Sequence, residues 1–457
     1  MSNTAEKKRQ LFETMSPAKA LAIMALPTVG SQMIVLVYNI ADTWFIGRTD
    51  NPSMIAASNM ALTVYMIAVS LANVFGVGGG SLMARLVGER KEADAAKAVS
   101  YSVILSGIVA AAFSLLTLIF MNPLMKLLGS EEATLQYCRQ YLLTTVVIGS
   151  IPTILSMSMP QLLRNAGYSK EAGLGTAIGS LLNVALDPLF MFVILPRGNE
   201  VLGAGIATML SNFISLAYFI IIFRKVRNES VLKVSFKPVR LAKEHMKSLY
   251  MVGVPAAVSI FLFDLITIVL NKLVSGYLDH ITPVAAIGIV LKLERIPINV
   301  GLGVCLGMVP LVAYNYGARN FKRMDQIVVL AAKVIIIFSA VCSVLFFILA
   351  KPFVGIFVKD MLTVNLGTGY LKMRCFALPF MMVGYYVVNY MNAVNKGKIS
   401  FLLAILRHVV LIIPIMLLMN YIWGIYGLML SQLVADILNA VISVVIKHVI
   451  VSRERRS

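Results

Sequence analysis

The sequence predicts an all-α integral membrane protein. Its 457 residues are 59% hydrophobic and only 13% charged, whereas soluble domains are nearer ~45–50% apolar and ~25% charged. The apolar runs are continuous and long enough to cross a bilayer as helices, which takes roughly 20 residues. They do not alternate in polarity as the strands of a membrane barrel do. We therefore expect membrane-spanning helices throughout the chain.

The apolar runs predict about twelve spans, and the longest polar connection, after the sixth span, divides them into two lobes. The spans cover residues 18–46, 54–84, 97–121, 137–162, 172–195, 201–223, 249–278, 283–314, 326–349, 366–393, 399–420 and 425–449. The predicted units are an N-terminal tail (1–17), a first lobe (18–223), a basic linker (224–248), a second lobe (249–449) and a basic C-terminal tail (450–457).

The distribution of Lys and Arg predicts the orientation. With the N-terminus in the cytoplasm, about 27 of these residues fall in cytoplasmic segments and about 5 in outer loops, as the positive-inside rule requires. Both termini and the linker are then cytoplasmic. The basic cytoplasmic segments lie beside anionic membrane lipids. They account for the net charge of +19. We therefore expect no nucleic acid partner.

The two lobes resemble each other in sequence. The segment Arg85–Arg90 ends the second span, and a similar segment, Tyr314–Arg319, ends the eighth span about 229 residues later. Pro27 and Pro255 correspond at nearly the same offset. Because each lobe has six spans, both lobes start from the same side of the membrane. This predicts a parallel repeat, an arrangement found in transporters whose two halves rock against each other.

Two carboxylates lie inside spans of the first lobe. Asp42 is in span one and Asp187 in span five, where a charge is costly and usually functional. Tyr38 and Asn183 each precede one of these acids by four residues and so share its helical face. Pro188 kinks the helix and frees carbonyl oxygens that can coordinate a cation. The alternative is a structural kink in which Asp187 caps a broken helix.

Helix geometry places both acids in the outer half of the membrane. Spans one and five both run outward, and a rise of ~1.5 Å per residue brings the acids to about 20–33 Å from the cytoplasmic side. Thr208, in span six, is either a further hydroxyl ligand or a packing residue. In the second lobe Asp187 aligns with Ile413, and Asp42 aligns near Leu270. The acid pair is thus specific to the first lobe, which favours a dedicated cation site.

The spans of the second lobe also contain charged residues, which together form a candidate polar site. Asp264 follows Pro255 by nine residues. Glu294 has basic neighbours in span eight, which favours a mutually neutralising network. Arg407 in span eleven faces either the cleft between the lobes or a partner acid, and Asp436 in span twelve is the candidate partner.

Motifs for catalysis or for a bound cofactor are absent from the sequence. The four cysteines have no CxxC spacing, and no two of the four histidines have metal-ligand spacing. The glycine-rich segment 76–80 lacks the Lys-Ser/Thr of a phosphate-binding loop. We therefore expect neither an enzyme nor a cofactor, and no metal site beyond a Na⁺ site at Asp42, Asp187 and Asn183.

These motifs resemble the multidrug and toxic compound extrusion (MATE) family over essentially the whole chain. Tyr38 with Asp42, and Asn183 with Asp187, resemble the first-lobe cation site of the prokaryotic branch that includes DinF-like and MepA-like proteins. The resemblance implies two six-helix lobes in a V around a central cleft. It also implies an inner (plasma) membrane antiporter, functional as a monomer, that exports amphipathic, often cationic organic compounds by alternating access, driven by H⁺ or Na⁺.

Of the two coupling ions, the residues favour H⁺. Burial favours the neutral form of a carboxyl group, and a proton needs only the acids, whereas Na⁺ needs a complete oxygen shell. Protonation would let span one bend at Pro27 and release the substrate. The main alternative is a flippase for lipid-linked oligosaccharides, which has a related two-lobe architecture. A receptor or channel-like binding module is a second alternative, and the internal duplication argues against it.

Overall fold

The computed structural model describes residues 3–49, 51–235, 240–274 and 281–454. Within these ranges the regular structure is helical, with no strand. A first body, the N-lobe, contains α2 (Pro17–Gly47), α3 (Pro52–Gly88), α4 (Glu92–Ile119), α5 (Met121–Leu127), α6 (Glu132–Leu142), η1 (Leu143–Ile148), α7 (Ser150–Asn165), α8 (Ser169–Pro188), η2 (Leu189–Ile194) and α9 (Glu200–Val226). It is preceded by the short helix α1 (Asn3–Glu13).

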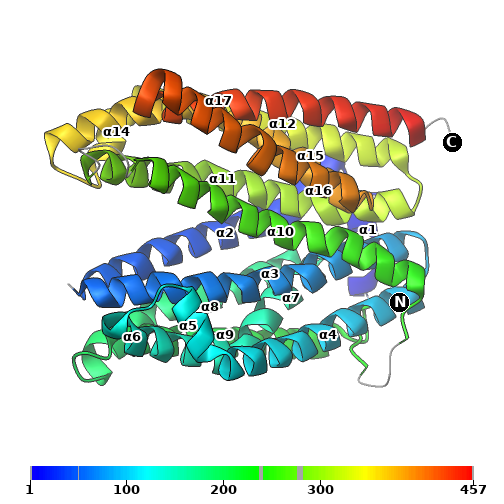
Figure 1. The fold of residues 1–457 in the computed structure, drawn as a ribbon. Coiled ribbons are helices and arrows are strands. Elements are labelled where there is room, and N and C mark those ends of the chain that lie inside the picture. Colours follow the sequence, from blue (N-terminus) through cyan, green and yellow to red (C-terminus); the bar gives the residue numbers. More distant parts are fainter. Residues whose placement is uncertain (1–2, 50, 236–239, 275–280, 455–457) are drawn as a thin grey trace.

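The second body, the C-lobe, lies beside the first (Figure 1). It contains α10 (Lys243–Val274), α11 (Ile281–Gly317), α12 (Phe321–Ile348), α13 (Ala350–Gly355), α14 (Met361–Arg374), η3 (Cys375–Ala377), α15 (Leu378–Ala393), α16 (Gly397–Ile405), η4 (Leu406–Leu411) and α17 (Ile412–Glu454). The lobes lie close together at the end that carries both chain termini, the terminal end. They spread apart toward the opposite end, the far end, in the predicted V (Figure 1).

Each of the twelve predicted spans falls on helix, as far as the chain is described. Nine helices in the described ranges are long and apolar enough to cross a membrane, or ten if the pair Glu132–Ile148 and Ser150–Asn165, bent by 54°, is one span. The last candidate, Gly397–Val451, is 55 residues long. It contains two predicted spans, because the backbone breaks at Gly424 (φ 58°, ψ −141°). Residues 275–278 of the predicted seventh span lie outside the described residues.

The duplicated segments pack against each other at the terminal end. A Cβ on Gly88 would lie 2.1 Å from the Tyr314 carbonyl oxygen, and a Cβ on Gly317 would lie 2.1 Å from the Arg85 carbonyl oxygen. Only glycine allows the two backbones to approach this closely. The turn after each glycine contains an arginine with positive φ, at position 90 in the N-lobe and position 319 in the C-lobe. The two turns therefore share one backbone shape.

The N-terminal segment, predicted as a tail, instead forms α1 and contacts both lobes at the terminal end. On the N-lobe side, Lys8 donates to the Gly167 carbonyl and its ammonium lies 3.9 Å from the centre of the Tyr168 ring. On the C-lobe side, Phe12 stacks on Tyr314 with ring centroids 4.8 Å apart. Arg323 donates to the carbonyl oxygens that end α1, at 2.7 Å from Phe12 and 3.2 Å from Leu11. These bonds satisfy acceptors that a helix C-terminus leaves free.

Candidate functional site

A central cavity of about 510 Å³ lies between the lobes. Its N-lobe wall includes Tyr38, Asn183 and Thr208, and its C-lobe wall includes Tyr385 and Arg407. The lining is mostly apolar and is interrupted by amides and hydroxyls. This composition is typical of a site for small organic molecules.

The two predicted acids lie one helical turn beyond residues of the cavity wall. Asp42 follows Tyr38 on α2, and Asp187 follows Asn183 on α8. Both helices run from the terminal end to the far end (Figure 1), so the acids lie in the far half of the molecule. Asp42 is partly buried and Asp187 is fully buried, and the two carboxylates are close enough to interact electrostatically. The fold therefore brings the predicted pair together.

One oxygen of each acid has no hydrogen-bond partner among the described residues. Oδ1 of Asp42 and Oδ1 of Asp187 are both buried and unpaired. Leaving a buried polar atom unpaired costs about 1–3 kcal/mol, and more when the group is charged. A proton or a bound cation would relieve this cost at either oxygen. Cation uptake is thus the chemistry that this pair supports.

Asn183 and Thr208 hold Asp187 in place. The Asn183 amide, in the orientation that satisfies both of its polar atoms, donates to Asp187 Oδ2 at 2.8 Å. Its oxygen accepts from the Thr208 hydroxyl at 3.1 Å and from the Thr208 backbone N–H at 3.2 Å. Thr208, predicted as a cation ligand, therefore contacts the acid through Asn183. The amide oxygen is already engaged twice, so it is a weaker candidate ligand for Na⁺.

The backbone changes form directly after Asp187. Pro188 ends α8, and the next six residues, Leu189–Ile194, form the wider turns of the π-helix η2. A proline has no N–H to donate to the preceding turn, and π-helical turns occur frequently at functional sites. Pro27, the other predicted bending position, lies inside α2 without interrupting the helix.

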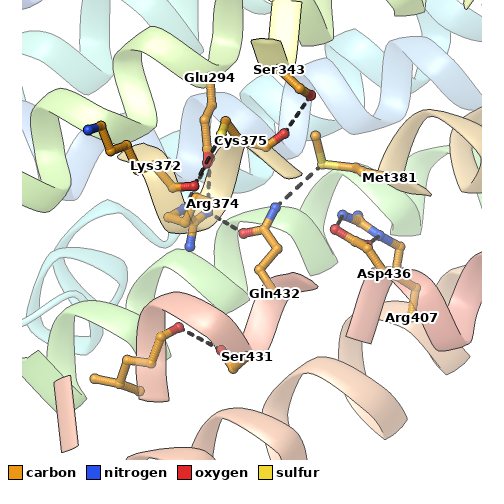
Figure 2. Close-up of polar contacts among 11 residues, drawn as sticks. Glu294, Ser343, Lys372, Arg374, Cys375, Met381, Arg407, Ser431, Gln432 and Asp436 are labelled. Atoms are coloured by element: carbon orange, nitrogen blue, oxygen red, sulfur yellow. Dashed lines mark hydrogen bonds and ion pairs between the residues drawn. The ribbon is translucent and has the colours of Figure 1, made fainter. Parts of the chain in front are cut away.

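Two buried ion pairs lie in the described part of the C-lobe, and the first has a partner that the sequence does not predict. Glu294 on α11 accepts from Arg374 on α14 through both carboxylate oxygens, at 2.8 and 2.9 Å. Arg374 also donates to Gln432, whose amide nitrogen lies 3.5 Å from the Met381 sulfur (Figure 2). Glu294 is therefore neutralised by an arginine on another helix, a partner that the predicted network within span eight does not include.

The second pair joins Arg407 on η4 to Asp436 on α17. Arg407 Nε lies 2.7 Å from Asp436 Oδ1, and both residues are buried (Figure 2). The guanidinium also contacts His408 Nε2 at 3.0 Å and the Tyr385 ring, 5.0 Å from its centre. Asp264 lies on α10, and its side chain is outside what the structure describes. No group of three or more His, Cys, Asp or Glu side chains in the described residues could hold a metal ion.

Several residues around the site carry no sequence signal of their own. Tyr65 and Tyr141 are buried within electrostatic range of Asp42, but both are ordinary residues of apolar spans. Asn212 Nδ2 lies 2.9 Å from Thr153 Oγ1 and 3.4 Å from the Tyr65 hydroxyl. These contacts link three helices at the cavity wall, which includes Asn212 and Tyr65. Only spacing within one helix is visible in the sequence, and these contacts join different helices.

Comparisons with known proteins match both lobes to one protein family. A family model described as MatE matches residues 27–189 and 255–422, one segment in each lobe. The chain is 30% identical over 444 residues to the multidrug export protein MepA of Staphylococcus aureus strain N315, covering 97% of this chain and 96% of that protein. It is 29% identical over 443 residues to the protein of the same name from Staphylococcus saprophyticus, with the same coverage.

Solved structures show the same fold. The crystal structure of MATE in complex with MaL6 superposes with a TM-score of 0.92 at 20% identity, over 100% of both chains. A multidrug resistance MATE family transporter of the MOP superfamily, in an outward-facing conformation, superposes with a TM-score of 0.89 at 21% identity, over 98% of both chains.

Proposed function

Because the chain belongs to the MATE family of transporters, we propose that it is a cation-coupled exporter of amphipathic, often cationic organic compounds. Proteins of this family are transporters and not enzymes. The relatives that match over nearly the whole chain are named multidrug export proteins. The cavity between the lobes has the size and the mixed apolar and polar lining that such compounds require.

One observation carries the coupling step: the unpaired buried oxygens of Asp42 and Asp187 beside the cavity. A cation bound there lowers the free energy of the state in which the acids are buried. It moves the lobes only if the two states bind it with different affinities. We propose H⁺ as this cation, because the Asn183 oxygen already accepts two hydrogen bonds and leaves few free ligands for Na⁺.

In the proposed cycle the lobes, residues 18–223 and 249–449, move against each other about the linker 224–248. The terminal end faces the cytoplasm of a prokaryotic cell, as the predicted charge distribution requires, and the far end faces outward. The structure then represents a state open to the outside. Uptake of H⁺ by the acids favours bending of α2 at Pro27 and release of the compound, and the monomer carries out the whole cycle.

Transport by the purified protein in liposomes tests this function. A pH gradient and a Na⁺ gradient are imposed separately, and efflux of a cationic fluorescent dye is measured. We expect the inward pH gradient to drive transport in the absence of Na⁺. Transport driven by Na⁺ at constant pH, without a response to the pH gradient, would assign the site to Na⁺. No gradient-dependent transport of any dye would reject the exporter function.

The orientation is tested by chemical labelling of intact cells. A cysteine at Gly198, in the connection between η2 and α9, should react with an impermeant thiol reagent. A cysteine at Lys233, in the predicted linker, should react only after the cells are permeabilised. The reverse pattern would place the acids near the cytoplasm.

A further inference from the structure

Arg164, near the end of α7, is a buried arginine with no acidic partner among the residues that the structure describes. The residue is 4% exposed. Its Nη1 donates to Gln161 Oε1 at 2.7 Å, and its Nε is buried without a hydrogen-bond partner. No carboxylate of the described residues lies within ion-pair distance of it. A guanidinium has five N–H donors and stays charged in proteins, so most of its binding capacity is unused.

The other buried arginines of the described chain are better satisfied. Arg374 and Arg407 are each paired with a buried carboxylate, and Arg323 ends a helix by donating to two carbonyls. Arg85 donates to the hydroxyls of Ser81 and Ser248, to the side chain of Asn395 and to the carbonyl oxygens of Asn392 and Ala393. Arg164 is therefore the exception among five.

Arg164 also faces the central cavity and gives its lining a positive charge. The described residues that line the cavity include no Asp or Glu. Of the two lining arginines, Arg407 is neutralised by Asp436. Arg164 is thus an uncompensated charge at the terminal end of the cavity. The dipole of α7 makes a cation favourable at the helix C-terminus, which accounts for its position but not for the unpaired Nε.

We propose that Arg164 binds an oxyanion, and specifically the carboxylate of a transported organic compound. An arginine and a carboxylate form two parallel charge-assisted hydrogen bonds, and Gln161 accepts from only one of the N–H groups at the end of this guanidinium. Gln161 and Asn392 line the same end of the cavity, and Asn392 Oδ1 is itself buried and unpaired. These amides provide donors and acceptors for polar groups next to the carboxylate.

The anion site is separate from the acid pair. Between Ser169, where α8 begins just after Arg164, and Asn183, a helical rise of ~1.5 Å per residue gives about 20 Å. A carboxylate at Arg164 therefore does not compete with a cation at Asp42 and Asp187. The proposal rests on the proposed export function and extends its substrates from cations to compounds that also carry a carboxylate.

Binding of two matched dyes tests the proposal. The probes are a fluorescent xanthene dye with a free carboxylate and the methyl ester of the same dye, titrated into the purified full-length protein. Arg164→Gln should weaken binding of the acid dye by about ten- to a hundredfold, the range expected for a lost charged hydrogen bond. Binding of the ester should change less than about twofold. Arg164→Lys, which keeps the charge, should retain part of the affinity for the acid.

Arg139→Gln is the matched control, because Arg139 is exposed on α6 and its loss changes the net charge equally. It should leave both affinities unchanged. If Arg164→Gln weakens both dyes equally, or neither, the proposal is wrong. Ester binding also reports whether the variant is folded.

Two further measurements separate the remaining explanations. Titrations repeated with phosphatidylglycerol or phosphatidylcholine in the micelles show whether a lipid phosphate occupies the site. Arg164-dependent binding of phosphatidylglycerol, with no Arg164-dependent binding of the acid dye, would overturn the assignment to a substrate.

Gradient-driven export of the ester dye in liposomes tests the exporter function alone. If the liposomes export the ester dye and Arg164→Gln does not change the affinity for the acid dye, the anion site is rejected and the exporter function stands.

Discussion

The carboxylate of Glu13 accepts a hydrogen bond from the hydroxyl of Tyr314 at 2.6 Å, across 301 positions of sequence. The same carboxylate lies 2.6 Å from Arg90 in the N-lobe and 3.0 Å from Arg9 of its own helix. Glu13 thus joins the two lobes at the terminal end, directly beside the reciprocal contact of Gly88 and Gly317. Opening of the terminal end requires α1 to release at least one lobe.

Glu13→Gln should shift the protein toward states open at the terminal end, because it removes the charge that holds Arg90 and weakens the bond from Tyr314. Spin labels at the exposed positions Lys170 and Lys322, in a background without the native cysteines, report the distance between the lobes. We expect a longer or broader distance distribution than in the parent. Arg9→Gln, which removes only the contact within α1, should have a smaller effect. An unchanged distribution for Glu13→Gln would show that α1 does not hold the lobes.

The same contact has a defined pH dependence. Burial raises the pKa of Glu13, but hydrogen bonds from Tyr314 and Arg9 and the charge of Arg90 outweigh it and lower the pKa below the ordinary value of 4.5. A lowered pKa means that the stabilisation is present above the ordinary pKa and is lost as pH falls through the lowered one. The label distances should therefore not change through Glu13 between pH 5 and pH 8. A change in that range that disappears in Glu13→Gln would contradict this.

Asp42→Asn and Asp187→Asn should each abolish gradient-driven efflux, because each removes one of the two groups that take up the cation. The double variant should be no worse than either single one if the acids act as a unit. Dye efflux from cells is measured against expression level, which should stay close to that of the parent. Full activity of both single variants would remove the acids from the mechanism.

Gly88→Val should separate the lobes at the terminal end, because even a Cβ there would overlap the Tyr314 carbonyl oxygen. We expect destabilisation of about 1–3 kcal/mol, seen as a lower thermal unfolding midpoint, together with loss of transport. Gly30→Val is the control, because a Cβ at Gly30 in α2 has no neighbour within 4 Å. Equal effects of both substitutions would mean that helix propensity, and not the contact between lobes, is responsible.

Glu294→Gln should destabilise the C-lobe, because it leaves the buried Arg374 without its counter-charge. Breaking a buried pair by removing one partner costs about 3–5 kcal/mol, whereas replacing both partners with apolar residues is often neutral. Glu294→Leu combined with Arg374→Met should therefore unfold at a higher temperature than Glu294→Gln. If the double variant is stable but inactive, the pair takes part in transport in addition to its structural role.

The sequence predicts the helices well because the signal lies within each span. Hydrophobic length places the twelve ranges, and spacing of four residues places Tyr38 beside Asp42 and Asn183 beside Asp187. Partners on other helices are less visible. Asp436 is a predicted partner for Arg407 because acids are rare in spans, but no sequence feature selects Arg374 as the partner of Glu294. Arg374 lies inside the predicted span 366–393 together with a second basic residue, Lys372, and composition does not show which of them pairs with an acid on another helix.

The packing of α1 and the isolation of Arg164 could not be predicted for the same physical reason. The segment 3–13 is polar and precedes the first span, so composition favours a solvated tail. Its fixed position depends on Tyr314 and Arg323, more than 300 residues away. Arg164 looks like an ordinary basic residue at the end of a span. Only the three-dimensional structure shows that it is buried and lacks an acid.

The depth of Asp42 and Asp187 determines how the cell's electrical potential can act on the proposed cycle. With the far end outward, a cation reaches these acids after crossing only the outer part of the bilayer. A full crossing at 100 mV is worth about 2.3 kcal/mol per unit charge, so loading of the site should use only a fraction of that energy. The rest of this electrical energy is released while the lobes carry the charge inward. Membrane voltage should therefore set the rate of lobe movement more strongly than the affinity for the ion.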